Sequence, residues 1–191
     1  MNFDFEKNLE MDVFDLFRKR INEVETFLKS TQHEEVCICD EVFKTEGKRK
    51  YIKINELSHK KGVYFFYKEK ADIIDYLYVG ECHVVNEKWD ITYRLKQHFQ
   101  KSQKSGLLYR IMDDKPINIS EKIDRINSQQ FDEGAKKKQR SEEIKKAEKK
   151  AINSLKGVKI GYFDLSDKDE AFILLTESIL ITNCDSKYNK K

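Results

Sequence analysis

Two tyrosines on neighbouring predicted strands are the first residues along the chain whose side chains and spacing could support a chemical reaction. They lie in Gly62-Val63-Tyr64 and in Tyr78-Val79-Gly80. If the two strands form a hairpin that is symmetric about residue 71, the phenols lie directly opposite each other on one face of the sheet. A glycine flanks each of them, where the missing side chain lets a ligand or a backbone approach. Tyrosine is also common in strands for packing alone.

A predicted helix that follows the hairpin carries cations at helical spacing. Arg94 and His98 are four residues apart and therefore share one helix face. Lys101 extends this basic stripe, which would suit a phosphate group. The alternative is an ordinary solvated helix face.

One carboxylate lies in or beside the apolar face of a predicted helix over residues 170–181. Glu177 comes three residues after Leu174 and four before Ile181. An unpaired buried carboxylate is costly, so Glu177 should meet a cation or line a cleft. A structural salt bridge would satisfy it equally well.

Taken in order along the chain, these features resemble the GIY-YIG nuclease family. The matching segments cover residues 60–100 and 158–190, and each motif is short, but five motifs in the right order make the match specific. They are Gly62-Val63-Tyr64, Tyr78-Val79-Gly80, Arg94 with His98 one turn later, Glu177, and Lys187-Tyr188-Asn189.

The resemblance implies a metal-dependent endonuclease that hydrolyses DNA phosphodiester bonds. Tyr64 would be the general base or its relay, with Tyr78 orienting it. Arg94 would bind the scissile phosphate through its planar guanidinium group. The implied catalytic set is Tyr64, Tyr78, Arg94, His98, Glu177 and Asn189.

The same resemblance implies one divalent cofactor ion, Mg²⁺ or Mn²⁺, held by Glu177. Mg²⁺ keeps several waters and takes only one or two carboxylates besides substrate phosphate. Asn189 would support the site from the tail, and His98 is a second candidate proton handler. We expect no zinc site, because Cys82-His83 lacks two further ligands.

The sequence departs from the family pattern at several places. Glu81 stands where the family often has Lys after the second motif, and Ser186 stands near the final Tyr-Asn where a proline is usual. The spacer between the two tyrosine motifs is long. The distance from His98 to Glu177 also exceeds a compact core, so residues of about 104–156 are predicted to be an insertion.

The elements that must position these residues give an α/β (α+β) fold class. We expect a small mixed or antiparallel sheet flanked by helices. Residues 1–57 are predicted to be an N-terminal extension made of a helix over 4–29 and a β-hairpin of strands 35–43 and 50–57, with its turn at 45–48. Residues 58–191 would form the nuclease domain, with the helical insertion inside it.

The net charge of +3 over 191 residues hides an uneven distribution. Residues 1–46 carry 6 Lys+Arg against 12 Asp+Glu, whereas residues 94–156 carry 17 against 9. A basic stretch is a candidate track for a polyanion, although such runs are often only solvated. The candidate DNA contacts are Lys96, Lys101, Lys104, Arg110, Lys136, Lys137, Lys138 and Arg140.

Composition excludes several other classes. No stretch approaches the ~20 apolar residues of a membrane span. The first ten residues do not read as a signal peptide, and the four cysteines form no CxxC pair. We therefore expect reduced thiols, a cytoplasmic location and no membrane partner.

The leading hypothesis is a restriction-type enzyme with its DNA-binding elements inside the core. Palindromic cutting would require a homodimer, or sequential nicking by monomers. The alternative is a catalytically inactive nucleic-acid-binding or regulatory module on the same fold. A third hypothesis is a structural protein whose acidic N-terminal helix docks on another chain.

Overall fold

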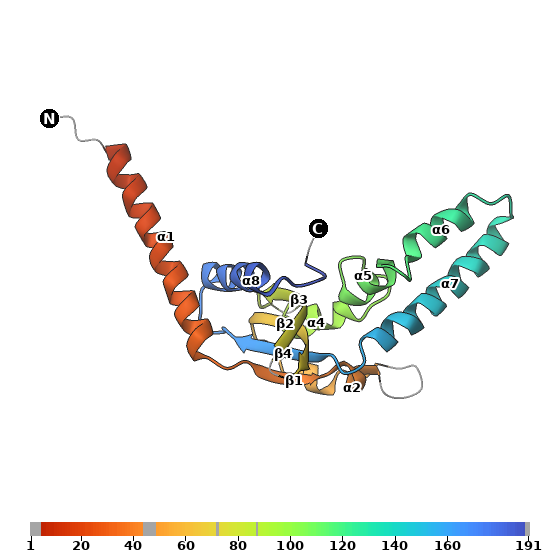
Figure 1. Cartoon of the computed structure of the whole chain (residues 1–191), viewed down its shortest axis with the longest axis horizontal. Helices are drawn as coiled ribbons and strands as arrows, with labels where there is room; N and C mark the ends of the chain where they lie inside the picture. Colours follow the sequence, from red (N-terminus) through yellow and green to blue (C-terminus); the bar gives the residue numbers. More distant parts are fainter. Residues whose placement is uncertain (1–4, 44–48, 72, 87, 190–191) are drawn as a thin grey trace.

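The computed structural model describes residues 5–43, 49–71, 73–86 and 88–189, and side chains from Val13 onward apart from Lys70. One sheet with helices on both faces organises this part of the chain (Figure 1). In chain order the elements are α1 (Phe5–Ser30), β1 (Glu34–Ile38), α2 (Cys39–Phe43), α3 (Ile52–Asn55), β2 (Gly62–Lys70), β3 (Ile73–Cys82), α4 (Ile91–His98), α5 (Leu107–Asp113), α6 (Ile119–Asn127), α7 (Glu133–Ser154), β4 (Lys159–Asp164) and α8 (Glu170–Cys184).

The sheet is antiparallel throughout and has the strand order β1-β4-β2-β3. β4 lies in the centre, where Tyr162 pairs with Tyr64 of β2 on one side and with Glu34 of β1 on the other. The predicted fold class of an antiparallel sheet flanked by helices is confirmed. β1 also brings the segment before residue 58 into the same sheet as the tyrosine motifs.

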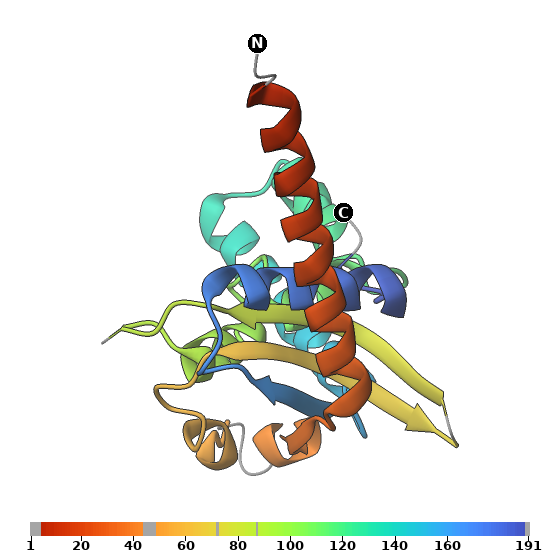
Figure 2. The same ribbon diagram turned by 90° about the vertical axis from the view of Figure 1, so that its left-hand side faces the viewer.

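Two apolar layers sandwich the sheet, as the alternation of strand side chains requires. On one face Val63, Phe65 and Phe163 meet Phe27 of α1 and Phe172 of α8. Figure 2 shows α8 lying across this face beside α1. The other face packs against α3, α4, α5 and α7 through buried residues that include Ile54, Leu95, Leu108, Met112 and Ala151.

The predicted N-terminal β-hairpin is wrong in the described residues. Only Glu34–Ile38 is a strand, and the chain then turns into α2, whose first turn holds Asp40 and Glu41. Acidic side chains favour that end of a helix. In the second segment Ile54 and Leu57 are buried while Ile52 is exposed, which is helical and not alternating spacing. The expected turn at 45–48 lies outside the described residues.

The predicted register of the tyrosine hairpin is wrong by two residues. Tyr64 pairs with Gly80, and Tyr78 pairs with Phe66. A β-bulge between Phe66 and Tyr67, where Leu77 is an extra residue on β3, accounts for one residue of this shift. The other residue comes from the turn, because Lys70 pairs with Ile73 and the hairpin is therefore centred between residues 71 and 72. Because the offset is two residues, the phenols of Tyr64 and Tyr78 remain on the same face of the sheet as diagonal neighbours.

The insertion is helical and is anchored in the core. α5 buries Leu107, Leu108, Ile111 and Met112 against the sheet face that carries Tyr64. α6 and α7 then run side by side as an arm that extends from the body (Figure 1). Gly157, with φ +69°, stands just after α7. No helix of the described residues is long and apolar enough to cross a membrane.

Replacing Leu108 with alanine tests whether the insertion is part of the cooperative unit. The side chain is fully buried, so Leu108→Ala should lower the free energy of unfolding by about 2–5 kcal/mol. Urea unfolding followed by circular dichroism should still give one transition. Ile73→Ala is the control, because Ile73 is 71% exposed. A separate low-stability transition that carries only helical signal would contradict this integration.

Candidate active site

Gly80 allows the phenol of Tyr64 to lie across the edge strand β3. A Cβ atom at position 80 would come within 2.6 Å of Tyr64 Oη and 2.9 Å of Tyr78 Cε1. Real Cβ atoms do not approach other atoms that closely, so any side chain here would displace one of the two rings. The glycine of the second tyrosine motif therefore has a specific steric role.

Tyr64 reaches His98 at the end of α4. Tyr64 Oη and His98 Nε2 are 2.8 Å apart, and both side chains are buried. The ring of Tyr78 completes the cluster, with its centroid 4.6 Å from that of His98. Two tyrosines from the hairpin and one histidine from the following helix thus meet in one place.

The backbone fixes the protonation of His98. The N–H of Leu107 donates to Nδ1 at 3.1 Å, so that nitrogen carries no proton. Burial, with the nearby charges of Arg94 and Arg110, lowers the pKa of His98 to about 3. The neutral ring therefore holds its proton on Nε2 and donates it to Tyr64 Oη. His98 acts through Tyr64 as a positioning residue.

Tyr64 is held as a neutral phenol in this state. Burial raises its pKa well above the usual value, whereas the positive charge of Arg94 acts in the opposite direction. Because Oη already accepts from His98, the phenol keeps its own proton free for another acceptor. Burial likewise raises the pKa of Tyr78, and Arg110 and Arg94 oppose it.

Arg94 lies one turn before His98 on α4. Asp90 caps this helix by accepting from the N–H of Tyr93. The guanidinium of Arg94 is half-buried, donates weakly to Gln97 Oε1 at 3.4 Å, and lines a hollow of about 380 Å³. Glu81 and Trp89 line the same hollow. This is a concave place in which a cation can meet an anionic group.

Glu177 projects from α8 toward the same cluster of charges. Burial and the neighbouring carboxylate of Glu81 raise its pKa to about 7, although Arg94 and His83 act against this. Glu81 points to the α8 face of the sheet, because it pairs with Val63 and follows Val79 by two residues. Its Oε2 lies 2.7 Å from His83 Nδ1.

The donor set around Glu177 suits a hard cation. Among the described residues, no group of three or more His, Cys, Asp or Glu side chains is arranged to hold a metal ion. An ion here would therefore rest on Glu177, with Glu81 as its neighbouring carboxylate and other oxygen ligands from water or substrate. Mg²⁺ is commonly bound in this way.

Asn189 binds the backbone of β3 and does not point to a reacting group. Its Oδ1 accepts from the N–H of Val79 and its Nδ2 donates to the C=O of Val79, each at 2.7 Å. Ser186 Oγ donates to the same Oδ1 at 2.6 Å, from the position where the family usually has proline. Tyr188 N–H adds a bond to the C=O of Leu77 at 2.8 Å. The tail thus fixes the strand that carries Tyr78.

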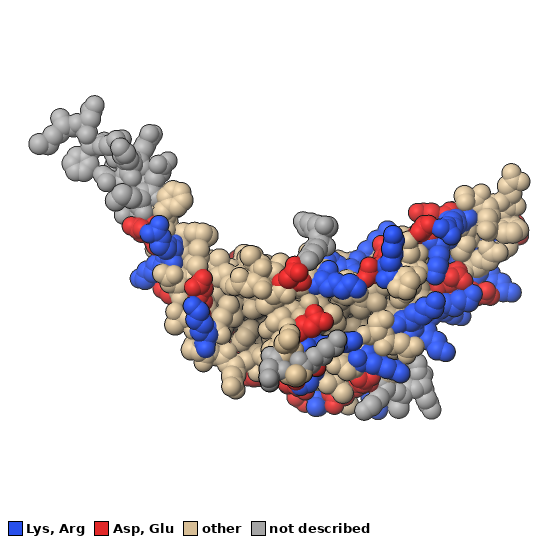
Figure 3. All heavy atoms as spheres, viewed as in Figure 1, with Lys and Arg blue, Asp and Glu red and all other residues tan. Residues whose placement is uncertain are grey.

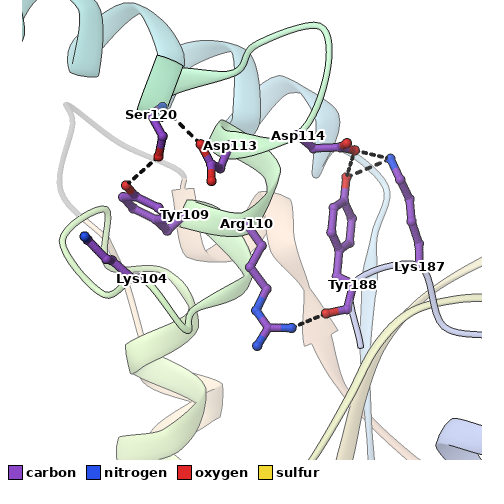
Figure 4. A pocket seen from close by; sticks show the side chains of 8 residues that line it. All are labelled: Lys104, Tyr109, Arg110, Asp113, Asp114, Ser120, Lys187 and Tyr188. Atoms are coloured by element: carbon purple, nitrogen blue, oxygen red, sulfur yellow. Dashed lines mark hydrogen bonds and ion pairs between the residues drawn. The ribbon is translucent and has the colours of Figure 1, made fainter. Parts of the chain in front are cut away.

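Arg110, one of the predicted DNA contacts, lies beside Tyr78 and the C-terminal tail. Figure 4 shows it pointing from α5 toward the backbone of Tyr188, whose C=O accepts a hydrogen bond from Nη1. Its Cζ also lies 5.4 Å from the centre of the Tyr78 ring. No sequence spacing signals this contact, because it depends on how α5 folds back. The insertion therefore supplies a second cation beside the tyrosines.

The remaining predicted DNA contacts are spread over α4 to α7 and differ in availability. Lys101 pairs with Glu148 at 3.0 Å, and Lys96 lies over the ring of Tyr51. Lys136 and Arg140 pair with Glu133. Lys101, Lys104, Lys137 and Lys138 are exposed. Figure 3 shows Lys and Arg side chains gathered on the arm of α6 and α7.

Glu81 and His83 lie beside Glu177 and affect its pKa, but they were not predicted from the sequence as site residues. Glu81 was visible only as a departure from the family pattern. Strand alternation was the available signal, since it places residue 81 on the face opposite Tyr64, which α8 covers. All four cysteines are free.

No family model matches the chain, and neither the curated proteins nor the solved structures contain a match to it.

Replacing Glu177 with glutamine should stabilise the metal-free protein at high pH. The folded-state pKa of about 7 lies above the ordinary 4.5, so the contribution of Glu177 is intact below pH 4.5 and is lost as pH rises through 7. Glu177→Gln should therefore match the wild type at pH 4 and exceed its unfolding free energy by about 1–3 kcal/mol at pH 8.

Urea unfolding in EDTA at the two pH values measures this difference. Glu142→Gln on the exposed side of α7 is the matched control and should change little at either pH. Equal stability of the wild type and Glu177→Gln at pH 8 would contradict a strained carboxylate.

Proposed function

We propose that this chain is a metal-dependent endonuclease of the GIY-YIG type that hydrolyses DNA phosphodiester bonds, with a restriction-type role. The observation that carries the proposal is the buried Tyr64–His98 hydrogen bond at 2.8 Å, with the Tyr78 ring against His98 and the charges of Arg94 and Glu177 acting on the Tyr64 phenol. Sequence motifs that are dispersed over the chain become one electrostatically coupled group in the fold. A packing role alone gives no reason for a phenol, a guanidinium and a strained carboxylate to gather there.

Hydrolysis needs an activated water, and Tyr64 is the group suited to handle its proton. His98 Nε2–H donates to Tyr64 Oη and would stabilise a phenolate, and the charge of Arg94 favours the same form. Tyr64 must first give its own proton to water or to a substrate oxygen, and the phenolate that results would then accept a proton from the attacking water. Tyr78, whose ring lies against His98 and under the guanidinium of Arg110, would orient that water or the phosphate.

Arg94 and Arg110 supply fixed positive charge near the site. The fork of Arg94 suits two phosphate oxygens, whereas lysine would offer only a point charge. Arg110 lies beside Tyr78, and it could offset the loss of the lysine that Glu81 replaces. A divalent ion at Glu177, Mg²⁺ or Mn²⁺, would add charge against a phosphate oxygen when bound.

The proposed substrate is DNA that runs along the insertion. Exposed Lys104, Lys137 and Lys138 would provide salt-dependent affinity that is largely independent of sequence. A restriction-type enzyme acts in the cytoplasm, so the proposed location of this protein is cytoplasmic.

Cleavage of plasmid DNA and a mixed oligonucleotide pool, with Mg²⁺, Mn²⁺ or EDTA, tests the proposed function. The wild type should cut only with a divalent ion. Arg94→Ala, Arg94→Lys and Glu177→Gln should each cut at least about 100-fold more slowly, because each removes charge stabilisation specific to the reaction.

Lys29→Ala is the control, since Lys29 is exposed at the end of α1, outside the insertion, and pairs with Glu25 of its own helix. It should cut at the wild-type rate. Discrete products would indicate sequence specificity. Undiminished cleavage by purified Glu177→Gln protein would refute the site, and DNA binding without any cleavage would favour the inactive binding module.

Salt titration of DNA binding tests the basic track. In the Glu177→Gln background, adding Lys137→Gln and Lys138→Gln should reduce the slope of log K against log salt by about 2, one unit for each lost phosphate contact. Lys29→Gln on α1 is the control and should leave the slope unchanged. A slope unaltered by the paired substitution would exclude these lysines from phosphate contact.

A further inference from the structure

The N-terminal half of α1 is an apolar surface without support from the rest of the described chain. Val13, Phe14, Leu16 and Phe17 are 58%, 67%, 70% and 58% exposed. Figures 1 and 2 show this half of the helix projecting away from the sheet and from α8. Four large apolar side chains in two turns of one helix are far more than scattered surface residues, and such patches mark interaction sites.

The exposed surface continues a face of α1 that is already used for packing. Val24 is fully buried, and Phe27 packs edge-on against Phe163 and Phe172. Counting back from Val24 in steps of three and four reaches Ile21, Phe17 and Phe14, which is the spacing of a helix-pairing seam. The seam therefore extends from the body into solvent, where its second half has no partner among the described residues.

Charge along α1 restricts what can cover this seam. Residues 6–15 carry one Lys against four Asp+Glu, a net charge of −3, and Arg18-Lys19-Arg20 carry +3. An acidic first half would repel the phosphates of DNA and the head groups of anionic lipid. Two copies of α1 in antiparallel orientation would instead bring each acidic half against the other's basic turn.

From this exposed seam and its self-complementary charge, we infer that α1 pairs with α1 of a second copy of this chain in an antiparallel helix dimer. A twofold axis near Asp15 would place Phe14 and Phe17 of both copies in the seam, with Arg18 facing the acidic residues at 10–12 of the partner helix. The interface uses none of the residues of the proposed nuclease site, which come from β2, β3, α4 and α8. The pairing would give two copies related by a twofold axis, which matches the symmetry of a palindromic substrate.

Mass measurement on the full chain tests the dimer without DNA or metal. Sedimentation velocity and light scattering should give a species of twice 22.8 kDa that dissociates on dilution. Phe14→Glu with Phe17→Glu should raise the dimer dissociation constant at least about 100-fold, since it places four charges in an apolar seam. Ile73→Glu is the control, because Ile73 is 71% exposed on a different element and should leave the dimer intact.

Charge reversal tests the antiparallel orientation. Arg18→Glu with Lys19→Glu should weaken the dimer, and adding Glu10→Lys with Asp12→Lys should restore it, because the two halves then attract again. Circular dichroism and urea unfolding of every variant check that the body remains folded. A wild type that stays at 22.8 kDa at all concentrations, or a dimer that survives Phe14→Glu with Phe17→Glu, would overturn the inference.

Discussion

The hydrogen bond between Tyr64 and His98 is the constraint on which the rest of the site depends. It joins the second strand of the sheet to the end of α4, and it crosses β3 at the one residue that leaves room for the phenol. His98 is the donor in this bond, because the backbone N–H of Leu107 donates to Nδ1 and leaves the proton of the neutral imidazole on Nε2. The start of α5 thus determines that Nε2 of His98 carries the proton and donates the hydrogen bond to Tyr64.

Burial has opposite effects on the acids and the base gathered around that bond. It raises the pKa of both tyrosines and of Glu177, which favours their protonated forms, and it lowers the pKa of His98, which favours the neutral imidazole. Arg94 favours the ionised form of every acid in the group and also the neutral form of His98. The free protein therefore stores electrostatic strain at Glu177, and positive charge brought to this carboxylate would relieve it.

The motifs could be found in the sequence because they are local, and the fold class followed from apolar patterning. Tyr64 and Tyr78 lie on one face by strand alternation, and Arg94 and His98 are neighbours by helical spacing. The bulge at Leu77 was not predictable, since an extra residue leaves no mark in a strand-like pattern. α2 and α3 were missed because each is a single turn whose few apolar residues also fit a strand. Arg110 reaches Tyr78 only through tertiary folding, which no spacing encodes.

The central position of β4 determines when the sheet can be completed during synthesis. Gly62 at the start of β2 pairs with Asp164 at the end of β4, so the whole insertion is made between the two partners. Until β4 emerges from the ribosome, β1 and β2 each present an unpaired edge, and the aromatic residues of β2 lack the neighbours that β4 provides. The sheet therefore stays incomplete while α5, α6 and α7 are translated, a stage at which unpaired strand edges favour aggregation.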